Sequence, residues 1–254
     1  MATLAHIIIY PIKSLDPVRV RQARVLGSGA LEFDRRWAIA DASGKFLNGK
    51  RTPLVHRLRA SFDDQVERVT FQFDEQSGTF DLSNDREALE AWLGNVFMQP
   101  VRLLENVVGG FPDDTEAPGP TVISTATIDA VAHWFPPMTV SESRLRFRAN
   151  LEIADVEPFW EDRLFGAAGA QVEFRIGNVN FAGTNPCQRC VVPTRDPFTG
   201  ELWPRFAVEF AKHREATLPE WAERTRFSHF YRLAVNTHLA GRGDVIHVGD
   251  ELTL

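Results

Sequence analysis

Short alternations of apolar and polar residues, separated by turn residues, dominate the first hundred positions of this chain. Residues 18–25 (VRVRQARV) alternate in this way, and residues 69–73 (VTFQF) alternate again. A period of two is typical of a strand with one buried face, and polar turns between such runs favour antiparallel pairing. The pattern predicts a small antiparallel barrel or sandwich for this part of the chain.

A segment rich in glycine and proline, residues 105–120, separates this region from the rest. Such a composition interrupts helices and strands and indicates a boundary or a crossover. After it, strand-like runs such as 151–153 and 172–176 outnumber the helical patterns, so the helices are too few for a doubly wound parallel sheet. We therefore predict a β-rich α+β fold: a β-barrel-like N-terminal domain (1–104) and a mixed β-barrel domain with a few helices (105–254).

The charge balance argues against two classes of partner. The chain has 34 acidic and 28 basic residues and a formal net charge of −6. We therefore expect no nucleic-acid partner and no anionic membrane surface, although a small basic pocket remains compatible with this sum. No run approaches the roughly 18 apolar residues of a membrane-spanning helix, and the first ten residues lack the basic lead of a signal peptide. With only two cysteines, a cytoplasmic protein is expected.

The two cysteines, Cys187 and Cys190, are three positions apart. Structural zinc usually needs four ligands, and no second pair exists. A redox dithiol of the thioredoxin type begins a helix, whereas residues 191–194 (VVPT) are typical of a strand followed by a breaker. Buried inert cysteines are the third possibility. Arg189 favours a reactive thiol, because its charge lowers a neighbouring thiol pKa and holds an anion. Residue chemistry alone leaves these alternatives open.

The surrounding sequence resembles a known family. Residues 187–200 (CQRCVVPTRDPFTG) closely match the signature of the MOSC domain, the molybdenum cofactor sulfurase C-terminal domain. Further matching segments are residues 146–150 (RFRAN), 160–162 (WED) and 248–250 (VGD), and in the first half residues 10–14 (YPIKS) and 33–37 (FDRRW). The first half resembles the MOSC N-terminal β-barrel domain. The whole chain resembles the branch that contains the mitochondrial amidoxime-reducing component and its bacterial relatives.

This resemblance implies a molybdenum–molybdopterin (dithiolene pterin) cofactor between the two domains, with Cys190 as the protein's ligand to the metal and Cys187 in a supporting role. It also implies that Lys13, Ser14 and Arg35 hold the pterin phosphate. The remaining positions that it assigns to the cofactor cleft are Arg51, Ser124, Thr125, Arg148, Asn150, Gln188 and Arg189. Pyridoxal phosphate binding is also associated with this family.

Several of these residues have simpler structural interpretations. Lys13 can be a solvated surface lysine, and Arg35 can form a surface ion pair with Asp34. Ser124 or Thr125 can serve only as a helix N-cap. Arg148 and Asn150 can simply be surface side chains of a strand, with no role in binding.

Two aspartates need separate treatment. Asp162 is a candidate to orient a ligand or receive a proton, with a turn carboxylate as the equally plausible alternative, and Asp196 fits a structural turn. The resemblance implies an oxidoreductase that removes oxygen from a small N-hydroxylated substrate. Two cysteines cannot hold a four-cysteine iron–sulfur cluster, so a separate electron-donor protein is expected. The alternatives are a sulfur carrier or cofactor-handling protein, and a purely structural or cofactor-storage protein.

Overall fold

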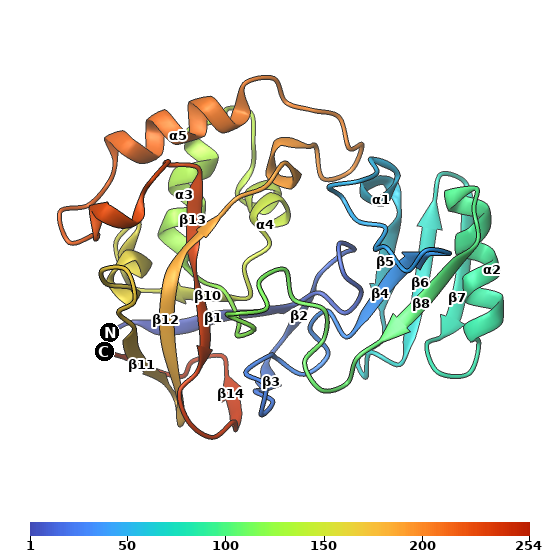
Figure 1. Ribbon diagram of the computed structural model, residues 1–254, viewed down its shortest axis with the longest axis horizontal. Coiled ribbons are helices and arrows are strands. Elements are labelled where there is room, and N and C mark those ends of the chain that lie inside the picture. The colour runs from blue at the N-terminus through green and yellow to red at the C-terminus, as the bar shows by residue number, and fades with distance from the viewer.

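The computed structural model describes residues 1–254 and contains many more strands than helices (Figure 1). The strands are β1 (Thr3–Ile9), β2 (Val18–Val20), β3 (Gln22–Arg24), β4 (Trp37–Asp41), β5 (Arg59–Phe62), β6 (Arg68–Phe73), β7 (Gln76–Asp81), β8 (Val101–Glu105), β9 (Val122–Ser124), β10 (Leu151–Ala154), β11 (Val172–Ile176), β12 (Val179–Gln188), β13 (Arg232–Leu239), β14 (Val245–His247) and β15 (Leu252–Thr253). The helices are α1 (Leu54–Arg57), α2 (Arg86–Phe97), α3 (Thr125–His133), α4 (Val140–Phe147) and α5 (Phe206–Ala216). This confirms the prediction of a β-rich α+β fold with a few helices. None of the helices has the length and apolar character that a membrane crossing requires.

An eight-stranded sheet with the order β15-β11-β12-β13-β9-β10-β1-β2 forms the largest part of the fold. The first strand of the chain lies inside it, because Ile7 on β1 pairs with Leu151 on β10 and with Val20 on β2. In a separate two-stranded sheet, β3 pairs with β14 near the end of the chain. The two predicted domains, 1–104 and 105–254, therefore share a sheet, which a division by sequence position did not anticipate.

Residues 37–105 form a smaller unit beside this sheet, on the right of Figure 1. Strand β4 pairs antiparallel with β8, and β5, β6 and β7 form an antiparallel meander. Helix α2 covers the meander, where Trp92 stacks on Phe71 with ring centroids 5.6 Å apart. The antiparallel pairing expected from the alternating runs is confirmed in this unit.

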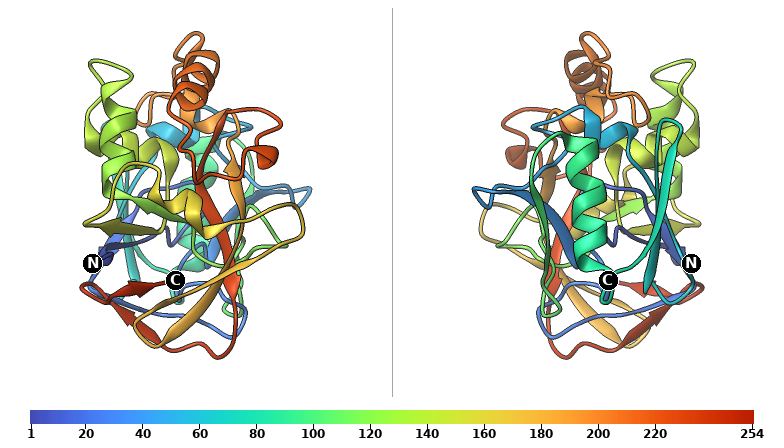
Figure 2. Two further views of the ribbon diagram at one scale, coloured as in Figure 1. Left: turned by 90° about the vertical axis from the view of Figure 1, so that its left-hand side faces the viewer. Right: turned by 90° about the vertical axis from the view of Figure 1, so that its right-hand side faces the viewer.

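Helices α3, α4 and α5 lie together at one end of the large sheet, and α2 stands apart from them on the other side of the molecule (Figure 2). Helices α3, α4 and α5 meet in a small aromatic core. In this core the ring centroids of Phe206 and Phe135 lie 4.3 Å apart, and those of Phe147 and Phe210 lie 5.4 Å apart. This core fixes the C-terminal end of α4, which is part of the site described below.

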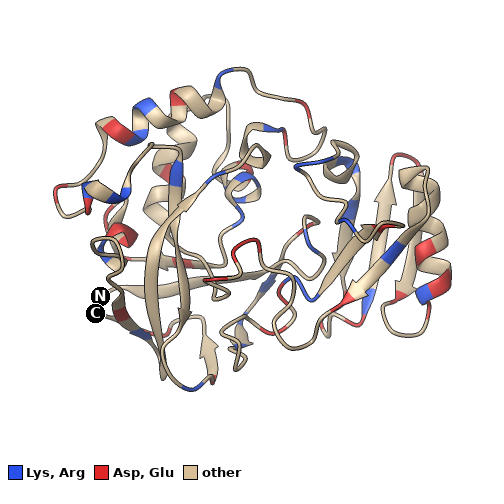
Figure 3. Ribbon diagram, in the orientation of Figure 1, with Lys and Arg blue, Asp and Glu red and all other residues tan.

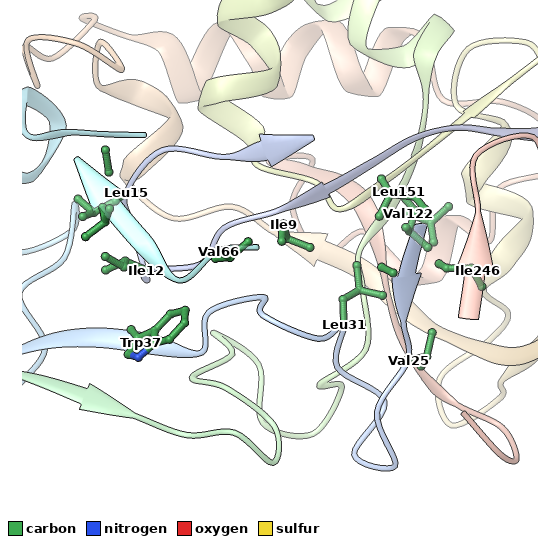
Figure 4. Close-up of a cluster of buried hydrophobic side chains, with 14 of the residues drawn as sticks. Ile9, Ile12, Leu15, Val25, Leu31, Trp37, Val66, Val122, Leu151 and Ile246 are labelled. Carbon is green, nitrogen blue, oxygen red and sulfur yellow. The ribbon is translucent and has the colours of Figure 1, made fainter. Parts of the chain in front are cut away.

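One continuous hydrophobic core connects the two parts of the molecule. Figure 4 shows Trp37 and Val66 of the smaller unit in the same cluster as Val122 and Leu151 of the large sheet and Ile246 of β14. Each of these side chains is at most 4% exposed. Since burial of apolar surface is the main stabilising contribution to a fold, the two parts support each other.

One local prediction was wrong: residues 191–194 contain a short 3-10 turn, Val192–Thr194, rather than a strand. Two other local features shape the smaller unit. The turn between β6 and β7 lies at Asp74-Glu75, because Phe73 already pairs with Gln76. Helix α2 begins at Arg86, with Asp85 as its N-cap and no capping side-chain bond.

Candidate functional site

A cavity of about 490 Å³ lies between the large sheet and the smaller unit. Its walls come from the β1–β2 connection, the segment before and within α1, the loop 109–121, the end of α4, the end of β12 with the segment after it, and β13. A volume of this size is typical of a small-molecule or cofactor pocket. The site therefore depends on segments from both halves of the sequence.

The cavity carries an excess of positive charge in a chain that is negative as a whole. Nine lysine and arginine residues line it, against four aspartates and no glutamate. Basic segments from both parts of the chain border the centre of the molecule in Figure 3. Such a concentration of cations in a concave site favours an anionic ligand.

At one end of the cavity, Lys13 is 6% exposed. Its Nζ donates hydrogen bonds of 2.8 Å to the backbone oxygen of Phe111 and to Asp113 Oδ1. Burial lowers the pKa of Lys13, and the charge of Asp113 opposes that effect. Lys13 is therefore a buried ammonium group within the cavity wall, and not the solvated surface lysine of the simpler interpretation.

Arg35 and Arg148 lie close to Lys13 and share an aromatic neighbour. The guanidinium carbons of Arg35 and Arg148 lie 5.3 and 4.0 Å from the ring centroid of Tyr10. Arg35 forms an ion pair with Asp34, whose Oδ1 accepts the backbone N–H of Tyr10 at 2.8 Å. Burial lowers the pKa of Arg148, and no carboxylate lies within ion-pair distance of it. This end of the cavity thus holds two guanidinium groups at fixed positions.

Asn150, 1% exposed, acts mainly as a support. Its Oδ1 accepts hydrogen bonds from Thr121 and, at 3.5 Å, from Arg35 Nη1, while its Nδ2 donates to Ile8. Asn150 follows helix α4, for which Arg148 is the C-cap. The interpretation of these two residues as a strand's surface decoration is therefore wrong.

Three of the residues assigned to this end have left-handed backbone conformations. The φ angles are 72° at Ser14, 50° at Arg35 and 52° at Arg148. Such angles are uncommon outside glycine, and each costs on the order of 1–3 kcal/mol. Conformations of this kind cluster at ligand-binding sites, because the surrounding structure must hold them.

The cavity lining also contains both cysteines as free thiols. Cys187 lies near the end of β12, and Cys190 follows that strand, where its Sγ accepts the backbone N–H of Val192 at 3.5 Å. Gln188 and Arg189 line the cavity beside them. Arg189 donates to the backbone oxygens of Phe147 and Leu233 at 3.0 and 2.6 Å, so its guanidinium is held in place. The structure therefore brings thiols and arginines into one site.

The structure does not bring the remaining candidates to this cavity. Arg51 points to Asp41 and the backbone oxygen of Phe46, outside the lining, although its neighbour Lys50 is part of it. Ser124 is fully buried as the N-cap of α3 and accepts the N–H of Thr127, and Thr125 is the first residue of that helix. The N-cap interpretation therefore describes the position of Ser124.

Asp162 also lies outside the cavity lining. It is 3% exposed and forms a buried ion pair with Arg214 of α5, which stacks over Phe159. Burial raises the pKa of Asp162, and Arg214 opposes that effect. The proposed proton-transfer role requires contact with the site, so this prediction is corrected: the carboxylate connects η1 (Trp160–Leu164) to helix α5. Asp196 accepts two backbone N–H groups within a turn, as expected of a structural aspartate.

Sequence reasoning missed three residues of the site. Tyr10 contacts the guanidinium groups of Arg35 and Arg148, Asp113 pairs with Lys13, and Arg232 lines the cavity near Cys187. Tyr10 precedes Lys13 in the segment that carries the family resemblance, so its position was a usable signal. The other two come from a loop and from a strand with no local pattern that indicates a site.

Comparison with known proteins identifies two matching families. Residues 1–99 match the MOSC N-terminal beta barrel domain, and residues 121–253 match the MOSC domain. The molybdenum cofactor sulfurase of Caenorhabditis elegans is 25% identical over 236 residues, and the match covers 84% of this chain and 32% of the relative. The molybdenum cofactor sulfurase of Drosophila mojavensis is 26% identical over 242 residues, and the match covers 82% of this chain and 30% of the relative. Mitochondrial amidoxime-reducing component 1 of Danio rerio is 22% identical over 290 residues, covering 98% of this chain and 84% of the relative.

The chain spans about a third of the length of these sulfurases but most of the length of the amidoxime-reducing component. The two family matches together cover nearly all of its sequence, and residues from both line the cavity. The chain belongs to the MOSC domain family and carries the MOSC N-terminal beta barrel domain before its MOSC domain.

Proposed function

We propose that this chain binds a molybdenum–molybdopterin cofactor in the cavity and reduces small N-hydroxylated compounds with electrons from a separate protein. The observation that carries the proposal is the meeting, in one cavity, of a free thiol at Cys190 with a buried ammonium and several guanidinium groups. A thiolate is a soft ligand suited to a soft metal. The cations suit an anionic group on the same molecule.

The residues present fit such a cofactor. Lys13 offers a point charge, Arg35 a planar fork and Ser14 a hydroxyl, which together are suited to hold a phosphate. Four partly buried cavity arginines have no carboxylate within ion-pair distance, and removing a charge from water without a partner is costly. An anionic ligand would therefore stabilise the site.

In the proposed reaction, the bound cofactor supplies the two-electron redox chemistry. The N–O bond of the substrate breaks, two electrons and two protons are taken up, and water leaves. Lys13, Ser14 and Arg35 would hold the phosphate, and Cys190 in the same cavity lining would present its thiol to the metal. His56 also lines the cavity, and burial lowers its pKa, so it is neutral at pH 7 and adds no charge. The electrons come from a partner protein.

The relative named mitochondrial amidoxime-reducing component 1 supports the reductase, because the match covers 98% of this chain and 84% of that protein. The matches to molybdenum cofactor sulfurases support a second candidate, in which the chain carries sulfur or handles the cofactor without turnover. In that case Cys190 would carry a persulfide, and the neighbouring thiol of Cys187 would be available to receive or release the sulfur.

Metal and cofactor analysis tests the proposal. Protein from a molybdenum-replete host is analysed for molybdenum and for extractable pterin, and the same extract is examined for pyridoxal phosphate. We expect about one molybdenum per chain, lost in Cys190→Ser and kept in the matched control Cys187→Ser. Parent protein without molybdenum and pterin would overturn the proposal. Reduction of an amidoxime with an artificial electron donor then separates the reductase from a sulfur carrier, which would instead release persulfide sulfur on treatment with a thiol.

A further inference from the structure

Four of the nine cavity cations have no carboxylate within ion-pair distance. Lys13 and Lys50 pair with Asp113, and the paired arginines are Arg35 with Asp34, Arg59 with Asp16 and Arg146 with Glu142. The four arginines without such a partner are Arg148, Arg189, Arg195 and Arg232. Arg148 lies at the end of the cavity that contains Lys13, whereas Arg232 lies beside the segment that contains the two cysteines.

Arg232 is incompletely satisfied. It is the first residue of β13, in register with Gln188 on β12. Its Nη1 donates to the backbone oxygen of Pro186 at 3.0 Å, and its Nη2 reaches Ser228 Oγ at 3.3 Å, at the limit of a hydrogen bond. Its Nε is buried and has no hydrogen-bond partner. A guanidinium has five N–H donors in a planar fork. Since Nη1 and Nη2 each make one hydrogen bond, each keeps one N–H for a ligand in the cavity that Arg232 lines.

The electrostatic surroundings of Arg232 differ from those of the phosphate end. Burial lowers the pKa of Arg232, the charge of Arg226 lowers it further, and Cys187 opposes them. His229 is also close enough for Arg232 to lower its pKa. The groups that act on Arg148 are Tyr10, Arg35, Asp16 and Asp113. Arg148 stacks on Tyr10 and donates to the backbone oxygen of Leu15, whereas Arg232 donates to the backbone oxygen of Pro186, so the two guanidinium groups provide two separate positions for negative charge.

We propose that Arg232 binds an anionic group of the substrate, so that the preferred N-hydroxylated substrates carry a carboxylate or a phosphate. This inference rests on the proposed function, since it identifies a substrate class for the same cavity. A phosphate of the cofactor already has Lys13, Ser14 and Arg35 at the other end. The free donors of Arg232 lie beside the cysteine segment, where the reacting group of a substrate would enter.

The experiment compares two ligands that differ by one charge: 4-carboxybenzamidoxime and benzamidoxime. Their dissociation constants are measured by calorimetry on the purified, cofactor-containing protein without an electron donor, so that no turnover occurs. The variants are Arg232→Gln, Arg232→Lys and the matched control Arg224→Gln, whose residue is 64% exposed and outside the cavity lining. Thermal unfolding of each variant verifies that it is folded.

We expect Arg232→Gln to weaken binding of the carboxylated compound by at least about tenfold, the effect of losing a charge-assisted hydrogen bond. Binding of the neutral compound should be unchanged, Arg232→Lys should keep part of the preference, and Arg224→Gln should match the parent. Equal affinity of the parent for both compounds, or an equal loss for both in Arg232→Gln, would overturn the inference. This binding comparison uses cofactor-containing protein and involves no turnover, so its failure would overturn only the role of Arg232. Failure of the molybdenum and pterin analysis would instead overturn the proposed function.

Discussion

Replacing Glu161 by glutamine should stabilise the protein at neutral and alkaline pH. Glu161 is 1% exposed, and its Oε2 accepts the N–H of Ser124 at 3.1 Å and the hydroxyl of Thr127 at 3.0 Å. The neighbouring carboxylate of Asp162 pairs with Arg214, so Glu161 itself has no cationic partner. Burial, and secondarily the charge of Asp162, raises the pKa of Glu161 from 4.5 to about 7.

The magnitude follows from this change in pKa. Below pH 4.5 the carboxyl group is protonated in both the folded and the unfolded protein, so it has no effect on their difference. Between pH 4.5 and 7 the folded state binds more protons than the unfolded state, so stability falls as pH rises. Since one pKa unit corresponds to about 1.4 kcal/mol, ionised Glu161 lowers the free energy of unfolding by about 3 kcal/mol above pH 7. Glutamine keeps an acceptor oxygen and carries no charge.

Urea unfolding at pH 5 and pH 8, followed by tryptophan fluorescence, measures the effect. Glu161→Gln should exceed the parent by up to about 3 kcal/mol at pH 8, with the difference shrinking toward pH 5. The matched control is Glu152→Gln. Glu152 is also 1% exposed but pairs with Arg144 Nε at 2.8 Å, so its loss should destabilise the protein by on the order of 3 kcal/mol. A Glu161→Gln variant that is less stable than the parent at pH 8, or a difference independent of pH, would refute the reasoning.

Three further predictions concern the cavity and the core. Lys13→Met should lower the molybdenum content of the purified protein, measured by elemental analysis, because the phosphate loses a buried charge; an unchanged content would contradict the role of Lys13. Asp113→Asn should tighten binding of inorganic phosphate by about two- to fivefold in calorimetry, since an exposed carboxylate no longer competes for Lys13; weaker binding would contradict this. Gly183→Ala should destabilise the protein by several kcal/mol in urea unfolding, because the added Cβ would lie 1.8 Å from the backbone oxygen of Leu164; near-parental stability would show that this contact relaxes.

The sequence predicted the strands well because their burial pattern is local. Alternation at 69–73 reappears in β6, where Val69 and Phe71 are buried and their neighbours are exposed. Residues of the β1–β2 connection and the cysteine segment were predicted from motifs, and the structure gathers them in one cavity. Their distances from each other depend on the large sheet, whose pairings join residues more than a hundred positions apart.

The failures arose where one residue type serves two purposes. A serine before a helix can be an N-cap or part of an anion site. The structure distinguishes the two roles, because Ser124 is buried and its backbone N–H donates to Glu161. A buried aspartate suits both proton transfer and an ion pair, and the partner of Asp162, Arg214, is 52 positions away. Arg232 was missed because no local pattern marks it as a site residue. Its place in the site follows only from the pairing of β13 with β12, the strand that contains Cys187.

The position of β1 inside the large sheet has a consequence for synthesis. Ile7 on β1 pairs with Leu151 on β10, which is synthesised much later. A ribosome that adds about 5–20 residues per second needs roughly 7–30 s to reach this partner strand. During that time Ile7, Ile8 and Ile9, all buried in the folded protein, have no β10 to pair with. The nascent chain thus presents an apolar strand edge of the kind that aggregates or recruits a chaperone. Because β1 is made well before its partner strand β10, the yield of folded protein should depend on how well the cell protects this segment in the meantime.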